Sequence, residues 1–537
     1  MYNISVALKL LLIFFGCSLI SCQQKSTHNY TVNDVFRYNE SSDIKTLDPA
    51  YASNQAHIWV CNQIYNSLVQ MDSALNIQPS LAESWSIDST ATIYTFNLRA
   101  DIQFYDPAGK YNSYLKASDV VFSLERLRSK TLAAPGAWIL ESVKKGGITA
   151  PNDTEVKFEL KEPNPAFLSL MSMQYASILS ETYYNDVAEN YFKQPISTGP
   201  YYYKFWEDKV KLVLRKNPKY FEKDANRVSL PYLEAISIRF LPDKHAAFLE
   251  FIKGNLDFIS GIDASYKDEV LDKEGKLKTK YESEINLKKQ DYLNTEYLAF
   301  LVDSMSFYPY NNADFRKAVN FAFDRNLMMK YIRNGIGTPA ENGFVPKGLQ
   351  AFEMDNKYTF YNKDSVEYYL SRSQYKIQGR PEIELHTNNS YLDLCEYIQN
   401  SLNGFGIKTR VTVHPSSTLR QMISKQKVQF FRASWIADYP DAENYLSLFY
   451  SENKAPNGPN YSHFENAIFD SLYVESRKIG AHKNRIPTYK LMQKIMMTES
   501  PVVPLYYDEV YLFMQKNIKG LQTNPMNLIQ IKYIDKQ

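Results

Sequence analysis

One short segment in the last quarter of the chain carries the residues whose types and spacing suggest chemistry. Asp438, Asp441 and Glu443 stand close together there, beside Trp435 and Tyr439. A pair of carboxylates next to aromatic rings is what a glycoside hydrolase uses as general acid and general base. However, all three carboxylates fall in one short stretch, which weighs against this pair. We therefore favour a binding site here and keep an extracytoplasmic glycoside hydrolase as an alternative.

No motif for covalent, metal or nucleotide chemistry accompanies that segment. The sequence lacks G-x-S-x-G, H-E-x-x-H and a G-x-x-x-x-G-K followed by Ser or Thr, the motifs of a nucleophile elbow, a zinc protease and a phosphate loop. The seven histidines are scattered and no Cys-x-x-Cys is present, so we expect no metal and no cofactor. The sequence thus predicts a protein that is not an enzyme.

Composition narrows the class of protein further. The chain has 537 residues, of which 44% are hydrophobic and 22% charged, values typical of a globular protein with roughly three domains. The formal net charge is only +2 and no basic stretch stands out, so we expect no nucleic acid as partner. Aromatic content is high, at 14% with 42 tyrosines. Tyr suits the wall of a wet cleft, and it equally suits strands.

The N-terminal residues have the pattern of an export signal. Lys9 precedes the apolar run 10–16, which is too short and too near the start for a permanent membrane span. The run leads into a segment of small and aliphatic residues that ends at Cys22 and resembles a bacterial lipobox. An ordinary signal peptide with an incidental Cys is the alternative. We favour a lipoprotein signal peptide over residues 1–21, followed by a polar tether over 22–30.

A lipid on Cys22 would hold the protein at a bacterial membrane. Several lipid chains make a stable anchor, whereas a single chain binds a membrane only marginally. Gln23 and Gln24 stand where some bacteria place the Asp that retains a lipoprotein in the inner membrane. The sequence therefore leaves both the inner and the outer membrane open.

Two cysteines remain outside the signal. Cys61 and Cys395 lie far apart in the sequence, in surroundings with helical spacing. A disulfide between them is compatible with an oxidising compartment, but we favour two buried thiols that each serve as a small apolar side chain.

Strand and helix patterns alternate along the chain. Period-two alternation of apolar residues predicts strands, and the 3.6-residue period predicts helices, one of them capped by Ser118 or Asp119. This alternation predicts a mixed α/β protein. The expected strands are 93–99, 156–160, 210–215 and 236–240, and the expected helices are 57–69, 120–125 and 246–252.

Several short motifs follow one another in a fixed order along the chain. They include Leu47-Asp48-Pro49, Gly254-Asn255-Leu256-Asp257, Ala322-Phe323-Asp324-Arg325 and Trp435-Ile436-Ala437-Asp438. Their order resembles that of the family 5 extracellular solute-binding proteins, the oligopeptide and dipeptide receptors of ABC importers. The resemblance extends from about residue 34 to about residue 525.

This resemblance implies an α/β, two-lobed periplasmic-binding-protein-like fold of type II, with an extra inserted domain and three structural regions. We expect lobe I to combine residues 31–63, 188–290 and 505–537, with an inserted domain II at 64–187. Lobe II, or domain III, is expected at 291–504. These bounds come from the resemblance and from the spacing of elements, which places element boundaries only approximately.

The resemblance also implies roles for the segment around Trp435. Asp438, three residues after this Trp, is expected to pair with the α-ammonium of a peptide through a charge-assisted bond. Arg432, three residues before it, is expected to receive a C-terminal carboxylate bidentately. A turn acceptor role for Asp438 and a salt bridge for Arg432 are the alternatives. Trp435 and Tyr439 are candidates for the cleft wall.

These features together predict the substrate-binding component of an ABC importer, which captures short peptides in a closing cleft between its lobes. The termini and main chain of a peptide would supply the affinity that all sequences share. The expected partners are ABC permease and ATPase subunits, and Asn39 and Ser53 are further candidates for the lobe I side of the site. An oligosaccharide or another small solute is the alternative ligand. We expect a monomer that is periplasmic and lipid-anchored.

Overall fold

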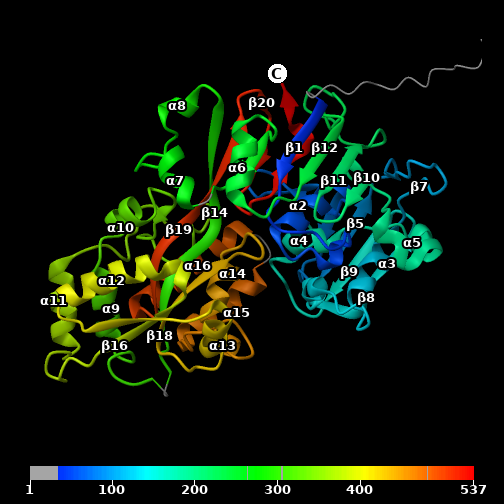
Figure 1. Cartoon of the computed structure of the whole chain (residues 1–537). Helices are drawn as coiled ribbons and strands as arrows, with labels where there is room; N and C mark the ends of the chain where they lie inside the picture. The colour runs from blue at the N-terminus through cyan, green and yellow to red at the C-terminus, as the bar shows by residue number, and fades with distance from the viewer. Residues whose placement is uncertain (1–33, 263, 304–305, 480–481) are drawn as a thin grey trace, which may run out of the picture.

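Two lobes lie side by side and are joined by two long strands (Figure 1). The computed structural model describes residues 34–262, 264–303, 306–479 and 482–537. The predicted signal peptide, the tether and the lipid site at Cys22 lie outside these residues. Within the described ranges, no helix combines the length and the apolar character that crossing a membrane requires.

A single mixed sheet of eleven strands runs through both lobes. Its order is β10-β11-β12-β1-β13-β19-β14-β18-β16-β17, and β15 (Thr338–Pro339) pairs with β19 beside this path. Lobe I contributes β1 (Val35–Asn39), β10 (Tyr201–Glu207), β11 (Lys211–Lys216), β12 (Ala235–Arg239) and β13 (Phe258–Ser260). Lobe II contributes β16 (Ile383–Thr387), β17 (Thr409–Val413) and β18 (Phe430–Ile436). The long strands β14 (Ile285–Phe300) and β19 (Val502–Gln515) belong to both lobes.

Strand β14 changes character where it passes from one lobe to the other. Its first eight residues are mostly half-buried, whereas every residue from Leu293 to Phe300 is buried. Its pairing with β19 shifts register between Asp291 and Thr295, which leaves residues 292–294 outside the ladder. We call residues 292–294 the crossover segment. Such a bulge bends a strand and frees side chains from the pleat.

The division into lobes at particular residues stays a prediction. The expected boundaries at 290–291 and 504–505 fall inside β14 and β19. Because both strands continue across the junction, the two lobes share one sheet and the junction is a pair of adjacent strands.

Lobe II builds its outer sheet from consecutive strand–helix–strand units. Helix α12 (Leu392–Gly404) connects β16 to β17, and α13 (Ser416–Ser424) connects β17 to β18. Both pairings of β16, with β17 and with β18, are parallel. In parallel sheets the loops that follow the strands meet at one edge, and ligands bind at that edge. Asp438 lies two residues after the end of β18 and therefore at this edge.

The inserted region carries a separate antiparallel sheet in the order β4-β5-β9-β8. Tyr94, Phe96 and Leu98 are buried along β5 while their neighbours are not, as the predicted alternation requires. These side chains belong to one hydrophobic core with Phe36 and Tyr38 of β1. The strands are β4 (Ala82–Ile87), β5 (Ile93–Leu98), β8 (Val143–Asn152) and β9 (Glu155–Leu160), next to α3 (Ala117–Leu127) and α5 (Glu181–Val187).

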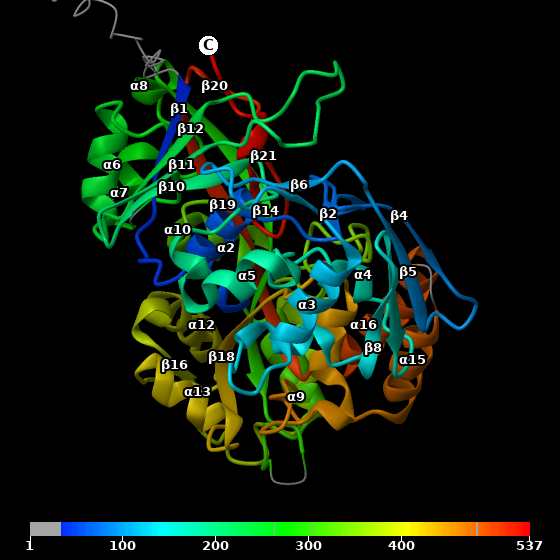
Figure 2. The same cartoon turned by 90° about the vertical axis from the view of Figure 1, so that its right-hand side faces the viewer.

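The hydrophobic core just described, which lobe I and the inserted region share, is called the shared core. It faces the core of lobe II around Tyr297, Phe344 and Tyr445. In Figure 2 the sheet with β5 and β8 overlaps in projection with α15 (Ala467–Lys478) and α16 (His482–Glu499) of lobe II, and Figure 1 shows the two bodies side by side. Leu75 of the inserted region packs against the lobe II core, and Tyr439 of lobe II packs against the shared core. Arg477 and Glu162 add an ion pair of 2.9 Å between the two bodies.

Most predicted elements are confirmed, with shifts at their ends. The expected strands near 156, 210 and 236 are β9, β11 and β12, and the expected helix 246–252 is α6 (Lys244–Ile252).

Two predicted helix ends are wrong. Helix α2 (Gln55–Ile64) stops at Ile64 and does not reach residue 69, because the Ile64 carbonyl accepts from the Gly199 N–H and from the Ser197 hydroxyl. Helix α3 begins at Ala117, so Asp119 lies inside its first turn and accepts from the Lys116 N–H at 2.9 Å.

The two cysteines of the described chain are free thiols. Cys61 belongs to the shared core and Cys395 to a core of lobe II, so the structure places them in different hydrophobic clusters. Burial raises the pKa of both thiols, that of Cys395 to about 11. The preference for small apolar side chains over a disulfide is confirmed.

Candidate functional site

A cavity of about 360 Å³ opens between the lobes at the edge where Asp438 lies. Lobe I and the inserted region form one wall, the crossover segment contributes Tyr292 and Leu293, and lobe II contributes the residues just after β18. Asp438 is charged, and every other lining residue of the described chain is neutral. The residues that face this cavity include Ser53, Met71, Trp138, Met173, Tyr175, Ala437 and Met526.

The side-chain amide of Asn444 fixes the backbone of Asp438 at the edge of the cavity. The Asn444 Oδ1 atom accepts from the Asp438 N–H at 3.2 Å and from the Trp435 indole N–H at 2.8 Å. The Asp438 side chain is exposed to solvent within the cavity. Enclosure by the two lobes still raises the pKa of the Asp438 carboxyl, and the Asn444 amide partly offsets that rise. Burial raises the pKa of Tyr175, and the charge of Asp438 raises it further. The Asp438 charge therefore acts across the cavity.

Arg432 lies away from this cavity, in the interior of lobe II. Its side chain is 9% exposed and forms an ion pair with Glu296 of β14. The guanidinium carbon stands 3.2 Å above the centre of the Tyr391 ring. Burial raises the pKa of Glu296, and the Arg432 charge opposes that rise. A ligand carboxylate would therefore have to displace Glu296 to reach Arg432.

Further charged groups surround this ion pair beside the crossover segment. Asn294 donates to the Glu296 carboxylate at 3.2 Å and to the Asp508 carboxylate at 3.4 Å. Arg333 pairs with the same Asp508 at 3.1 Å. These contacts form a polar network, although Asn294 Oδ1, Arg333 Nε and Arg432 Nε have no hydrogen-bond partner in the described structure. This network ties β14 to β19 at the point where the lobes join.

The two aromatic candidates have structural contacts. Trp435 is half-buried and packs against the lobe II core. Tyr439 donates to the Glu443 carboxylate and packs against the shared core. Neither is among the residues that line the cavity. Trp138, Tyr175 and Tyr292 supply its aromatic surface instead.

Of the two lobe I candidates, one faces the cavity. Ser53 lines it, whereas the Asn39 amide donates to the Leu241 carbonyl and accepts from the Leu241 N–H. The lining residues Trp138 and Tyr175 were not predicted from the sequence, because each stands in a short 3-10 helix, Pro135–Leu140 and Gln174–Ala176, that has no clear periodicity or motif.

The other carboxylates of the segment have close partners. Asp441 forms a 2.6 Å ion pair with Arg485, and both side chains are almost fully buried. Glu443 accepts from the hydroxyls of Tyr439 and Tyr473. Burial raises the pKa of Glu443, and these two hydroxyls oppose the rise. Only Asp438 of the three carboxylates lines the interlobe cavity in the described structure.

Comparison with known sequences identifies the family of this chain. Residues 76–457 match the family model described as bacterial extracellular solute-binding proteins, family 5 Middle. The probable D,D-dipeptide-binding periplasmic protein DdpA of Escherichia coli (strain K12) is 25% identical, over 93% of each chain. Heme-binding protein A of Haemophilus influenzae is 23% identical, over 96% of this chain and 95% of its own.

Solved structures share the fold over almost the whole chain. HbpA2 from Haemophilus parasuis superposes with a TM-score of 0.84 at 22% identity, over 94% of this chain and 100% of that one. The unliganded open form of the periplasmic murein tripeptide binding protein MppA gives 0.82 at 20% identity, over 94% and 98%. DppA from Helicobacter pylori in complex with the peptide STSA gives 0.72 at 23% identity, also over 94% and 98%. The chain belongs to the family 5 bacterial extracellular solute-binding proteins.

Proposed function

We propose that this chain captures short peptides in the interlobe cavity and that Asp438 receives the α-ammonium of the peptide. One observation carries the proposal: a single carboxylate faces a cavity whose other lining residues are uncharged. Because enclosure raises the pKa of this carboxyl, its ionised form lacks part of its hydration and gains from a bound cation. A relative named for D,D-dipeptides and a structure solved with the peptide STSA support the same ligand class.

The neutral part of the wall suits side chains of many kinds. Met71, Met173 and Met526 line the cavity, and Met adapts its shape because it is unbranched and polarisable. Tyr175 and Tyr292 add large rings with polar tips. Such a wall offers apolar contact to a peptide without selecting one sequence.

The crossover segment is the place where the lobes would turn toward each other. Residues 292–294 lie outside the ladder between β14 and β19, and Tyr292 and Leu293 also line the cavity. The chain superposes better on the unliganded open form of MppA than on the peptide complex of DppA. This supports an open arrangement that closes over a ligand by hinge motion. The closed form would then be the shape that an ABC permease with its ATPase recognises.

The lipid predicted on Cys22 fits this role. A tether over residues 22–30 would keep the receptor near its transporter and raise the effective concentration without a new contact. A relative described as periplasmic supports the same compartment. We propose a periplasmic protein that is anchored by its lipid and works as a monomer.

Two other ligand classes differ in how well they fit the cavity. An anionic solute would meet Asp438 without a cation among the described lining residues, and like charges at close range repel. An uncharged oligosaccharide fits the Tyr-containing wall better, because sugars pack against aromatic rings with polar tips. The ligand that accompanies the protein on purification distinguishes these classes.

Native mass spectrometry of the freshly purified protein tests the proposal directly. We expect a series of co-purified peptide masses with the wild-type chain, and their loss in Asp438→Asn. Asp355→Asn is the matched control, because Asp355 is an exposed carboxylate on the same lobe, outside the cavity. A sugar mass, or peptides retained in full by Asp438→Asn, would contradict the proposal.

A further inference from the structure

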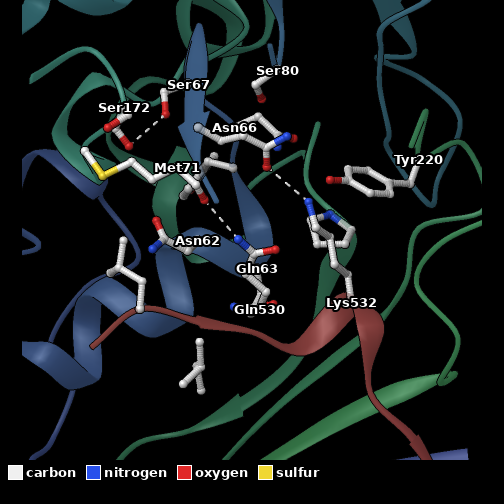
Figure 3. A pocket seen from close by; sticks show the side chains of 15 residues that line it. Asn62, Gln63, Asn66, Ser67, Met71, Ser80, Ser172, Tyr220, Gln530 and Lys532 are labelled. Atoms are coloured by element: carbon white, nitrogen blue, oxygen red, sulfur yellow. Dashed lines mark hydrogen bonds between the residues drawn. The ribbon is translucent and has the colours of Figure 1, made fainter. Parts of the chain in front are cut away.

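A second, smaller cavity lies behind the ligand cavity, inside the body formed by lobe I and the inserted region. It has a volume of about 90 Å³ and is lined by the end of α2, by β2 (Val69–Met71) and by the C-terminal segment 528–532. Asn, Gln and Ser side chains make up more than half of its lining residues, so we call it the polar compartment (Figure 3). Met71, Ser172 and Leu528 line both cavities. The polar compartment therefore adjoins the cavity that holds Asp438.

Charge is balanced within the polar compartment. The Lys532 ammonium is buried, pairs with Glu222 and donates to Gln70 Oε1 at 3.1 Å. The Gln70 amide in turn donates to the Glu222 carboxylate at 2.9 Å. A buried ion pair whose members are also hydrogen-bonded leaves little net charge to attract an ion. The polar compartment thus suits an uncharged group.

Three polar atoms of its wall, Asn66 Oδ1, Ser80 Oγ and Tyr220 Oη, make no well-aligned hydrogen bond to a described residue, and the Asn66 amide and the Glu222 carboxylate are the groups that act most closely on the Tyr220 hydroxyl. Burial, and next the charge of Glu222, raise the pKa of Tyr220 well above its usual range, so its hydroxyl keeps its proton. In Figure 3, Tyr220 points its hydroxyl into the cavity from the side of Lys532. Nearly all buried polar groups in proteins are paired with protein or with water, and a cavity of this size has room for several waters.

We propose that the polar compartment is a subsite for an uncharged hydrogen-bonding side chain of the ligand, an amide or a hydroxyl that replaces water there. The inference rests on the proposed peptide function, because the side chain enters from the cavity that holds Asp438. Asn66 and Ser80 offer an acceptor and a hydroxyl, and Tyr220 offers a hydroxyl that donates or accepts. A side-chain amide carries both a donor and an acceptor, so it matches this set.

The same groups reject other side chains. An apolar side chain that expels the water leaves the three polar atoms unpaired, which costs affinity. A charged side chain meets an ion pair that is already complete, so its desolvation is not compensated. The polar compartment accordingly gives a mostly permissive cavity one point of selectivity.

Calorimetric titration of two peptide sets tests this subsite. The parent peptide is Ala-Ala-Ala, and Gln or the nearly isosteric Met replaces one Ala at each position in turn. At one position we expect Gln to bind about tenfold more tightly than Met, the effect of roughly one hydrogen bond to an otherwise unpaired group. In Tyr220→Phe this preference should fall severalfold, while the affinity for Ala-Ala-Ala stays unchanged.

Tyr201→Phe is the matched control, because Tyr201 is also a buried tyrosine with an unpartnered hydroxyl but does not line the polar compartment. If Tyr220→Phe fails to fold, Ser80→Ala removes a second hydroxyl of the same wall and should lower the same preference. Tight binding of Ala-Ala-Ala with equal affinities for Gln and Met at every position would overturn the subsite alone. A Gln preference that survives both variants would do the same. No binding of any peptide would overturn the proposed function and the subsite with it.

Discussion

Asp438 and Arg432 lie six residues apart in one segment, yet the structure gives them opposite surroundings. Asp438 faces the interlobe cavity without an ion pair to another described residue. Arg432 is buried, paired with Glu296 and stacked on Tyr391. The two residues looked like the two electrostatic ends of a peptide site. In the described structure, only the anionic residue of the two faces the interlobe cavity.

The difference follows from where each residue stands relative to β18. Arg432 is inside the strand, where β14 is the adjacent antiparallel partner and Glu296 is a diagonal neighbour, paired with Ser434. Asp438 comes after the strand ends, where the chain turns and a side chain can reach the cavity. Arg432 is thus paired within the sheet, whereas Asp438, beyond the strand end, faces the cavity.

Glu296→Ala should have the largest effect of the variants considered, because it should lower the stability of the folded protein. Removing one partner of a buried ion pair leaves an uncompensated charge, so we expect the free energy of unfolding to fall by about 3–5 kcal/mol. Denaturant titration of the lobe II signal measures this loss. The double variant Glu296→Ala/Arg432→Met should recover part of it, because no buried charge remains. A loss below about 1 kcal/mol would show that Arg432 is less tightly held than its contacts indicate.

Asp438→Asn should weaken peptide binding without unfolding the protein. A charge-assisted bond to the α-ammonium in a partly enclosed cavity is worth about 2 kcal/mol, so affinity should fall about thirtyfold. Calorimetry with Ala-Ala-Ala measures the loss, and Asp355→Asn should bind as the wild type does. Unchanged affinity in Asp438→Asn would remove Asp438 from the site.

Acidification should weaken peptide binding through Asp438, with a smaller effect than the two substitutions above. Enclosure raises the pKa of Asp438 above its usual value near 3.8, so the carboxyl takes up a proton earlier on acidification than an ordinary Asp. A protonated carboxyl cannot pair with an ammonium, so affinity should fall as the pH drops through this raised pKa. Glu443, whose pKa is also raised, is nearby, but its partners are Tyr439 and Tyr473. The affinity of Asp438→Asn should lose this pH dependence, whereas a dependence that persists would point to another group.

Sequence patterns predicted the half-buried strands well and the fully buried ones poorly. β5 and β9 alternate in burial, so period two revealed them. The second half of β14 is buried on both faces, and most of β19 is buried as well, so neither strand shows a clear alternation. These two strands nevertheless carry the junction between the lobes, which periodicity alone does not reveal.

The candidate site also contains residues that a local pattern reveals and residues that only the tertiary structure brings together. Asp438 was found because a local motif marks it, and the structure places it in the cavity wall. The partner of Arg432, Glu296, stands 136 positions earlier in the chain, and no local pattern connects the two. Trp138 and Tyr175 reach the cavity from short 3-10 helices of the inserted region, so only tertiary structure brings them to it.

The most direct test combines Asp438→Asn with removal of the charge on the peptide. Calorimetry would compare Ala-Ala-Ala with its N-acetylated form on the wild type and on Asp438→Asn. If Asp438 receives the α-ammonium, acetylation should cost about thirtyfold on the wild type and almost nothing on the variant, a coupling of about 2 kcal/mol between the two changes. An equal cost of acetylation on both proteins would contradict the pairing of Asp438 with the amino end of the ligand.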